Sequence, residues 1–531
     1  MIAGLTRMAR RIVVAIAYGA SGATLALLVA GIVYLDNQPE LDVWHLAKLD
    51  AEFTETSAVD SFAGYLALEE RLFAQLNEQV YARIANDQRR LINRYNRGSL
   101  SDPERWSPNW NRSFVLRAEQ PRAGVLLLHG MSDSPYSLRG IGQTLNAAGA
   151  TVVGLRLPGH GTAPSGLVEI SWQDMAAAVR LAMRQLAAEL GEGDAARPLY
   201  IVGYSTGAAL AVNYALATLD DAALPKVDKL VLLSPAIGVS SAAVLAVWQA
   251  RLGHLLGLEK LAWNAIVAEY DPFKYSSFAV NAGDVVYRLT RHIQSRLEAL
   301  SRTGKLAGFP PVLAFSSVVD ATVSAPALVS GLFERLPAGG HELLLFDINR
   351  VAVIEPILKV DPIAAVLALR DQPGRRFTLS VVGNENDSSR RVVVRSARPG
   401  EAASSETALG LAWPDEVYSL AHVALPFAPD DPVYGGRPLG KSPGVHLGDL
   451  ALRGERGVLQ IPASDMLRLR WNPFYPYLES RILAFVGLSG DQGTRSALPR
   501  RVRPAGWRPG EAAIISGWTF HRAAAKASQP G

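Results

Sequence analysis

Cysteine is absent from the 531 residues of this chain. Its absence excludes disulfide bridges, thiolate metal sites, cysteine nucleophiles, a lipidated N-terminal cysteine and Fe–S clusters. A strong charge of one sign is missing as well, because 53 basic and 49 acidic side chains leave a net charge of only +4. No run of Lys and Arg is interleaved with aromatic residues, so nucleic acid is not an expected partner. The 49% hydrophobic content is that of a globular chain.

Charged side chains are missing from one long segment, Ile12–Leu35. A helix of 24 residues is roughly 36 Å long, enough to cross a hydrocarbon core of about 30 Å. Three arginines precede the segment, and Lys48 is the only Lys or Arg in the next twenty residues. This asymmetry predicts a single-pass transmembrane anchor with residues 1–11 in the cytoplasm and the rest on the periplasmic or extracellular side. The alternative is a cleaved signal peptide, but its apolar region is normally shorter and ends in small residues.

Beyond the anchor, changes in composition divide the chain. Residues 36–112 are expected to hold a linker, up to about residue 60, and an amphipathic helix whose apolar residues recur at helical spacing from Phe62 to Val80. Residues 113–495 form the main domain, interrupted by a helical, partly apolar stretch at 238–309 and by a second insertion at 350–412. Residues 496–531 are a basic tail rich in Arg, Pro and Gly. No internal repeat is found.

The main domain alternates short apolar strands with amphipathic helices. The predicted strands are Phe114–Arg117, Gly124–Leu128, Thr151–Leu155, Leu199–Val202, Lys229–Leu233, Val312–Phe315 and Glu342–Phe346. The predicted helices between them are Leu138–Ala148, Trp172–Leu190 and Thr206–Leu219. Continuous apolar strands separated by helices are typical of an α/β fold with a mostly parallel sheet that is covered on both faces.

A Gly-x-Ser-x-Gly motif at residues 203–207 supplies a candidate nucleophile, Ser205. The motif alone is weak, but a strand runs straight into it and a helix runs straight out. Such a sharp turn needs glycine on both flanks and lifts the serine oxygen above the sheet edge, at a helix N-terminus that favours negative charge. An ordinary strand-to-helix turn with a serine N-cap is the alternative.

The strand Val125–Leu128 ends in His129-Gly130-Met131. In acyl transfer two N–H groups hold the oxyanion, and we expect them at Met131 and Thr206. His129 and Gly130 would shape the loop and, with Tyr204, are the expected binding residues. For His129 itself a structural histidine bonded to the backbone is the preferred interpretation. The same holds for His160, in the tight loop Pro158–Gly161.

The chain order of this motif places the acid and the histidine after the nucleophile. Asp320 follows the strand Val312–Phe315 and is the predicted acid, with Asp347 as the second choice. Of the later histidines, His341 lies at the start of a strand, the wrong end for this site. His446 and His521 lie in stretches rich in Gly and Pro. His422 lies in a short loop with apolar flanks and is the predicted base.

Together, the strand ending in His129-Gly130, the Pro158–Gly161 loop, the Ser205 elbow, Asp320 and His422 resemble an α/β-hydrolase. The resemblance covers roughly residues 113–490 and is strongest to the branch of monoacylglycerol lipases, lysophospholipases and serine aminopeptidase-like hydrolases. It implies a fold with helices on both sheet faces and a reaction that uses no metal or organic cofactor.

The resulting hypothesis is a membrane-anchored serine hydrolase that acts on small-molecule or lipid esters through Ser205, Asp320 and His422. The apolar stretch at 238–268 would be a lid over the acyl site, or else a helical insertion that completes the core. A peptidase, a thioesterase or an esterase for polar esters would use the same three residues. A catalytically silent binding domain on the same fold is the alternative from another class. The sequence leaves the natural substrate and the oligomeric state open.

Overall fold

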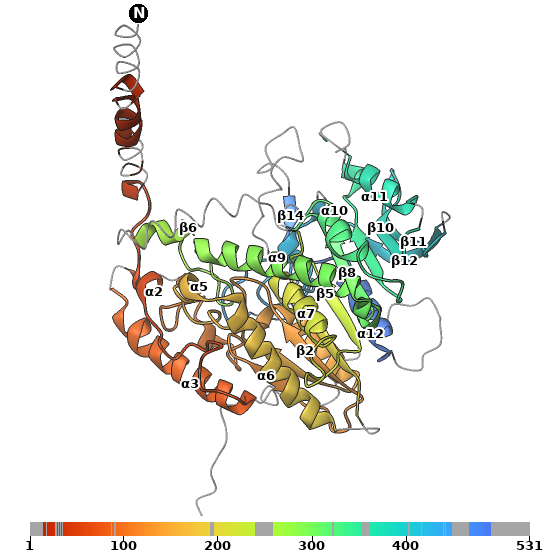
Figure 1. Cartoon of the computed structure of the whole chain (residues 1–531), viewed down its shortest axis with the longest axis horizontal. Helices are drawn as coiled ribbons and strands as arrows, with labels where there is room; N and C mark the ends of the chain where they lie inside the picture. The colour runs from red at the N-terminus through yellow and green to blue at the C-terminus, as the bar shows by residue number, and fades with distance from the viewer. Residues whose placement is uncertain are drawn as a thin grey trace, which may run out of the picture.

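The computed structural model describes residues 14–489, apart from 17, 27–28, 30, 32, 34, 86–87, 90–91, 192–195, 239–258, 321–322, 353–357, 359–360, 373, 402–403, 416, 439, 441 and 449–466. The expected anchor lies partly outside these residues, and the expected tail at 496–531 lies wholly outside them. The described residues between 14 and 36 are helical and stand away from the body of the molecule (Figure 1). Within the described part of the chain, no helix has both the length and the apolar character needed to cross a membrane.

A ten-stranded sheet runs through the described part of the chain (Figure 1). Its strands, in spatial order, are β1 (Phe114–Leu116), β3 (Ala150–Leu155), β2 (Ala123–Leu128), β4 (Leu199–Tyr204), β5 (Lys229–Leu233), β8 (Val312–Ser317), β9 (Glu342–Phe346), β10 (Thr378–Asn386), β11 (Ser389–Ala397) and β12 (Ser405–Ala412). The strands from β3 to β10 pair in parallel, whereas β1, β11 and β12 are antiparallel to their neighbours. All seven predicted strands and the mostly parallel sheet are therefore confirmed.

Helices cover both faces of the sheet, because successive strand residues point to opposite sides. Leu126 and Leu128 of β2 face one core, which contains residues of α3 (Phe62–Gln79), α6 (Trp172–Leu190), α7 (Thr206–Ala217) and α9 (Val280–Arg302). Val125 and Leu127 face the other core, with α4 (Arg139–Ala147) and α12 (Tyr475–Val486). The three helices predicted between strands are confirmed as α4, α6 and α7.

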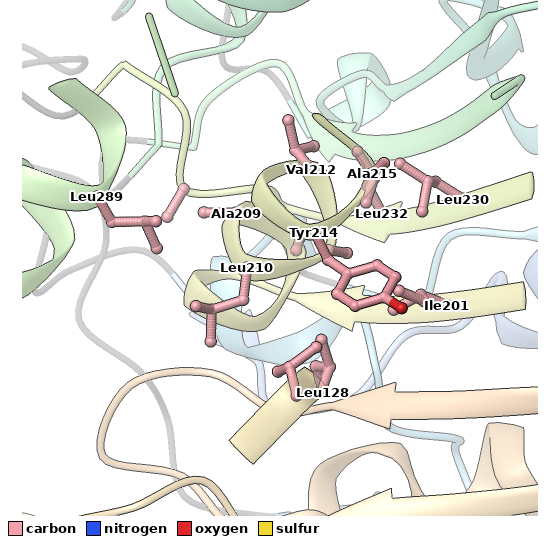
Figure 2. Close-up of a cluster of buried hydrophobic side chains, with 14 of the residues drawn as sticks. Leu128, Ile201, Ala209, Leu210, Val212, Tyr214, Ala215, Leu230, Leu232 and Leu289 are labelled. Carbon is pink, nitrogen blue, oxygen red and sulfur yellow. The ribbon is translucent and has the colours of Figure 1, made fainter. Parts of the chain in front are cut away.

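Helix α7 is buried almost all round, which fixes the element that follows the predicted nucleophile. Figure 2 shows its side chains packed between strand residues and α9; the labelled neighbours are Leu128, Ile201, Leu230, Leu232 and Leu289. Burying one leucine side chain contributes about 1.5–3 kcal/mol. The helix N-terminus is thus held rigidly against the ends of β2, β4 and β5.

The segment before β1 is packed, although residues 36–60 were expected to be a linker. Trp44 and His45 in α2 (Val43–Leu46) and Phe53 are each less than 5% exposed. The amphipathic helix predicted from Phe62 to Val80 is confirmed as α3. The linker prediction is wrong for residues 42–53, because isolated buried side chains in an irregular segment leave no periodic pattern.

The two predicted insertions differ in outcome. Residues 239–258, which hold most of the expected lid, lie outside the described residues. The later part of that insertion forms β6 (Trp263–Ala265), β7 (Phe278–Ala279) and α9, whose apolar side completes one core. The insertion at 350–412 forms α11 (Pro362–Arg370) and β10–β12, so it extends the main sheet instead of interrupting it.

Candidate active site

Ser205 occupies a strained turn between β4 and α7. Its backbone has φ 52° and ψ −116°, a region that side-chain-bearing residues rarely adopt. A Cβ atom on Gly203 would lie 2.5 Å from the Cα of Ala208, and one on Gly207 would lie 2.0 Å from the carbonyl oxygen of Leu128. Only glycine fits at both flanks, so the motif reflects steric need.

Two backbone hydrogen bonds join this turn to the end of β5. The Ser205 N–H donates to the carbonyl of Leu233 at 2.9 Å, and the Ser205 carbonyl accepts from the N–H of Ala236 at 3.1 Å. The serine side chain remains half-buried at the carboxyl edge of the sheet. The elbow therefore presents its hydroxyl while its backbone is fixed on two sides.

The three predicted catalytic side chains lie in one hydrogen-bonded line. Nε2 of His422 accepts from the Ser205 hydroxyl at 3.2 Å. Nδ1 of His422 donates to Oδ2 of Asp320 at 2.8 Å, and the Asp320 side chain is fully buried. The second carboxylate oxygen of Asp320 accepts from the N–H of Val323 at 2.9 Å. This order matches a nucleophile, a base and a group that orients the base.

Asp347, the second choice for the acid, is engaged elsewhere. Its carboxylate accepts two hydrogen bonds from Arg350, one of them at 2.7 Å. Burial raises the pKa of Asp347, and the Arg350 guanidinium opposes this effect. The geometry thus gives the acid's position to Asp320. His341, just before β9, accepts from the N–H of Val312 and lies at the amino ends of the parallel strands, whereas Ser205 lies at their carboxyl ends.

The loop after β2 lies against the nucleophile. A Cβ atom on Gly130 would be 3.2 Å from the Cβ of Ser205, so glycine allows the close approach. Met131, half-buried, follows directly, and Thr206 is the first residue of α7. Both predicted oxyanion donors therefore belong to backbone next to Ser205.

His129 and Tyr204 were expected to bind substrate, but both side chains are buried. Nε2 of His129 accepts from the N–H of Leu157 at 3.0 Å, and Nδ1 bonds the Gly130 carbonyl at 2.9 Å. Burial lowers the pKa of His129 well below its usual value, so the ring is neutral. The Tyr204 ring lies 5.5 Å from the His422 ring, and its hydroxyl donates to the His422 carbonyl at 3.5 Å. Both side chains are enclosed beside the Ser205 turn, and their predicted role in binding stays a prediction.

A buried ionic cluster beside this loop was missed by sequence reasoning. Arg156, 1% exposed, bonds Glu52 through both terminal nitrogens at 3.1 and 3.0 Å and Glu69 through Nε at 3.1 Å. Arg156 also donates to the carbonyl of His160 at 3.0 Å. Glu52 in turn accepts from the N–H of Gly159 at 2.8 Å. The N-terminal segment thus holds the Pro158–Gly161 loop, and the 104-residue separation of Glu52 and Arg156 leaves no local signal.

Among the described residues, no group of His, Asp and Glu side chains has the arrangement of a metal site. A cavity of about 300 Å³ lies between α11 and the strands β10 and β11. Its lining includes Asp347, Arg350 and Asn384 and none of Ser205, Asp320 and His422. The cavity is therefore separate from the three aligned side chains.

The sheet and the elbow are accompanied by a family match over part of the chain. Residues 119–338 are similar to the family model Hydrolase_4, described as serine aminopeptidase, S33. The matched segment contains Ser205 and Asp320 and ends before His422. No curated protein matches the chain.

Solved structures that are similar to part of this chain include several hydrolases. A monoacylglycerol lipase from Paleococcus ferrophilus is 21% identical, with 44% of this chain and 88% of that chain covered at a TM-score of 0.33. A soluble variant of monoglyceride lipase from Saccharomyces cerevisiae is 13% identical, with coverage of 44% and 82% and a TM-score of 0.35. A thioesterase domain from the curacin biosynthetic pathway is 18% identical, with coverage of 44% and 88% and a TM-score of 0.28. Similarities this weak do not indicate a substrate.

Proposed function

We propose that this protein is a serine hydrolase that cleaves carboxylic esters. The observation that carries the proposal is the continuous line from Asp320 through His422 to Ser205, with separations of 2.8 and 3.2 Å. In a catalytically silent binding domain, this alignment of the three side chains would serve no function. A buried carboxylate is also expensive to maintain unless a partner such as the imidazole N–H uses it.

The proposed reaction has two acyl-transfer steps. His422 takes the proton from Ser205 as its oxygen attacks the ester carbonyl, and Asp320 stabilises the imidazolium that forms. The N–H groups of Met131 and Thr206 hold the oxyanion at the positive end of the α7 dipole. His422 then protonates the leaving alcohol. In the second step it activates water, which releases the acid from Ser205.

Labelling with a fluorophosphonate probe tests the nucleophile directly. We expect the full-length protein to be labelled and Ser205→Ala not to be. Folded wild-type protein that resists the probe and hydrolyses no ester would refute the proposal.

Esters, thioesters and amides use the same three residues, so the substrate class needs its own comparison. The description of the matched family names an aminopeptidase, so amide cleavage is the main alternative to ester cleavage. We expect p-nitrophenyl esters to be hydrolysed with a higher kcat/KM than matched aminoacyl p-nitroanilides and acyl thioesters. A preference for the anilides would replace the esterase assignment by a peptidase.

We further propose that the substrate is an acyl lipid and that residues 12–35 anchor the enzyme in a membrane. Support comes from the uncharged 24-residue run and from the apolar sequence around 242–263. Each buried methylene contributes about 0.8 kcal/mol, so kcat/KM is expected to rise severalfold per two carbons until the acyl site is full. Octanoate no better than acetate, with both esters monomeric, would remove the lipid assignment and leave a general esterase.

A further inference from the structure

The chain makes a long detour before it reaches His422. Strand β9 ends at Phe346 beside β8, the strand that leads to Asp320. Helix α11 and strands β10–β12 then intervene, and the chain returns as β13 (Val417–Leu420), two residues before His422. The position of the base therefore depends on what brings β13 back to the end of β9.

Asn349, three residues after β9, makes that connection. Its N–H donates to the carbonyl of Tyr418 at 2.8 Å, and its side-chain Nδ2 donates to the carbonyl of Val417 at 2.9 Å. Both acceptors belong to β13. Asn349 is only 2% exposed, so water competes little with these bonds.

A second asparagine holds the first. Nδ2 of Asn384, in β10, donates to Oδ1 of Asn349 at 3.2 Å and to the carbonyl of Ser389 at 2.9 Å. Oδ1 of Asn384 accepts from the N–H of Arg350 at 2.9 Å. Both oxygens and both amide nitrogens of the pair are thus engaged. This fixes the orientation of each side chain. If either amide were turned by 180°, its NH2 group would face a donor and its oxygen would face a carbonyl oxygen.

We propose that Asn349, held by Asn384, is a positioning residue for the base His422. This inference rests on the proposed hydrolase function and extends it to the insertion at 350–412, whose strand β10 carries Asn384. Asn349 ties β13 to the chain just after β9, and Asn384 of β10 holds Asn349 in that position. At 3.2 Å the contact between His422 and Ser205 is already at the long end of hydrogen bonds, so a shift of about 1 Å breaks it.

β13 has further attachments besides Asn349, and these limit the size of the expected effect. Val417 and Leu420 are buried in the second core. The strand also pairs in parallel with β14 (Leu467–Leu469). Loss of the Asn349 side chain therefore leaves the strand attached but less strictly placed. A misplacement on the order of 1 Å lowers turnover by up to about 100-fold.

The test compares Asn349→Ala and Asn384→Ala with wild type in p-nitrophenyl ester hydrolysis by the full-length protein. We expect kcat to fall about 10- to 100-fold for Asn349→Ala and less for Asn384→Ala, with KM within about twofold. The loss should be equal for acetate and butyrate esters, because the base serves both. If Asn349→Ala does not fold, Asn384→Ala decides, since it removes the bond to Asn349 and leaves Asn349 attached to β13.

Asn146→Ala is the matched control. Asn146 also clamps backbone, through donation to the carbonyls of Leu116 and Ala150 at 3.2 and 2.9 Å, but at the opposite edge of the sheet. We expect its kcat to stay within about twofold of wild type. An equal loss in Asn146→Ala, or a folded Asn349→Ala with wild-type kcat, would overturn the positioning role.

A proton NMR measurement separates this proposal from the proposed function. The Nδ1–H of His422 should give a low-field signal, assigned by its loss in His422→Ala. Asn349→Ala should broaden or shift this signal upfield even if no ester is ever cleaved. An unchanged signal in Asn349→Ala would count against the positioning role of Asn349. If wild type is inactive but the signal changes in Asn349→Ala, the result counts only against the esterase assignment.

Discussion

The backbone at Ser205 shows how one residue is kept in an unfavourable conformation. A φ of 52° at a non-glycine residue costs on the order of 1–3 kcal/mol, and neighbours must offset it. The bonds to Leu233 and Ala236 and the buried helix α7 supply that support. This conformation places the Ser205 hydroxyl opposite His422, at the start of helix α7.

The two candidate acids can be separated by matched substitutions. We expect Asp320→Asn to lower kcat by several orders of magnitude, because His422 would lose its charged partner and its tautomer. Asp347→Asn should weaken the pairing with Arg350 and leave kcat within a few-fold. Steady-state kinetics on both folded variants checks this. The reverse ranking would transfer the acid's role to Asp347.

Glycine at 207 is expected to be indispensable for a steric reason. A Cβ atom there meets the Leu128 carbonyl at 2.0 Å, so Gly207→Ala must push α7 away from β2. We expect a loss of a few kcal/mol in the free energy of unfolding, by analogy with overpacked cores, together with loss of activity. Gly283→Ala in α9 is the control, since nothing lies within 4 Å of the added atom. In urea unfolding it should be neutral or up to about 1 kcal/mol more stable.

At the scale of elements, the N-terminal segment packs into the same domain as the main sheet. Glu52 accepts from Arg156 and from the Gly159 N–H, and the Leu157 N–H donates to His129 in the loop after β2. Two acidic side chains from this segment thus meet one buried guanidinium. Pairing is essential here, because a buried charge without a partner is strongly destabilising.

Glu52→Gln tests this tie. The amide removes one of the two carboxylate charges that pair with Arg156, and we expect the free energy of unfolding to fall by about 1–3 kcal/mol. Glu55→Gln, at an exposed position in the same segment, should change it by less than about 0.5 kcal/mol. Urea denaturation at pH 7 compares the two. Equal stability of both variants would show that the ionic cluster adds nothing.

At the scale of the whole molecule, buried neutral histidines predict sensitivity to acid. Burial lowers the pKa of His45, His160 and His341 to about 4. In the unfolded chain these groups titrate near 6.5, so below that pH the unfolded state binds more protons. Stability is therefore lost as the pH falls from about 6.5 towards 4, by up to about 1.4 kcal/mol per pH unit for each histidine.

Buried carboxyl groups have the opposite effect on the pH dependence of stability. A single substitution therefore tests the histidines more directly than the full curve of stability against pH. Burial raises the pKa of Asp133 and Asp271, and these groups favour the folded state as the pH falls. His341→Gln removes one titrating ring remote from Ser205. From pH 7 to pH 5 the urea midpoint should fall less, or rise more, in this variant than in wild type. An unchanged difference would contradict the role of His341.

The proposed anchor gives a prediction for the complete chain. Full-length protein should stay in the membrane fraction after a carbonate wash, and a variant without residues 1–35 should not. Protease added to intact spheroplasts should cut the domain if it faces outward, as the three arginines before residue 12 predict. Complete protection would reverse the orientation, and release by carbonate would remove the anchor.

Features encoded in contiguous residues could be predicted from the sequence. Seven strands, three helices and the elbow at Ser205 each have a local pattern, because burial repeats along a strand or helix and steric crowding selects glycine beside the serine. Asp320 and His422 followed from chain order, and the structure brings both side chains to Ser205.

Only the tertiary structure decided the contacts between distant segments. Asn349 meets Val417 across 68 residues, and Glu52 meets Arg156 across 104, without any periodicity that marks either pair. Three further features could not be predicted from the sequence either. They are the packing of residues 42–53, the three added strands, and the burial of Tyr204 and His129. A polar side chain has the same sequence signature in water as in a buried network, and its role is set by which backbone groups the fold places beside it.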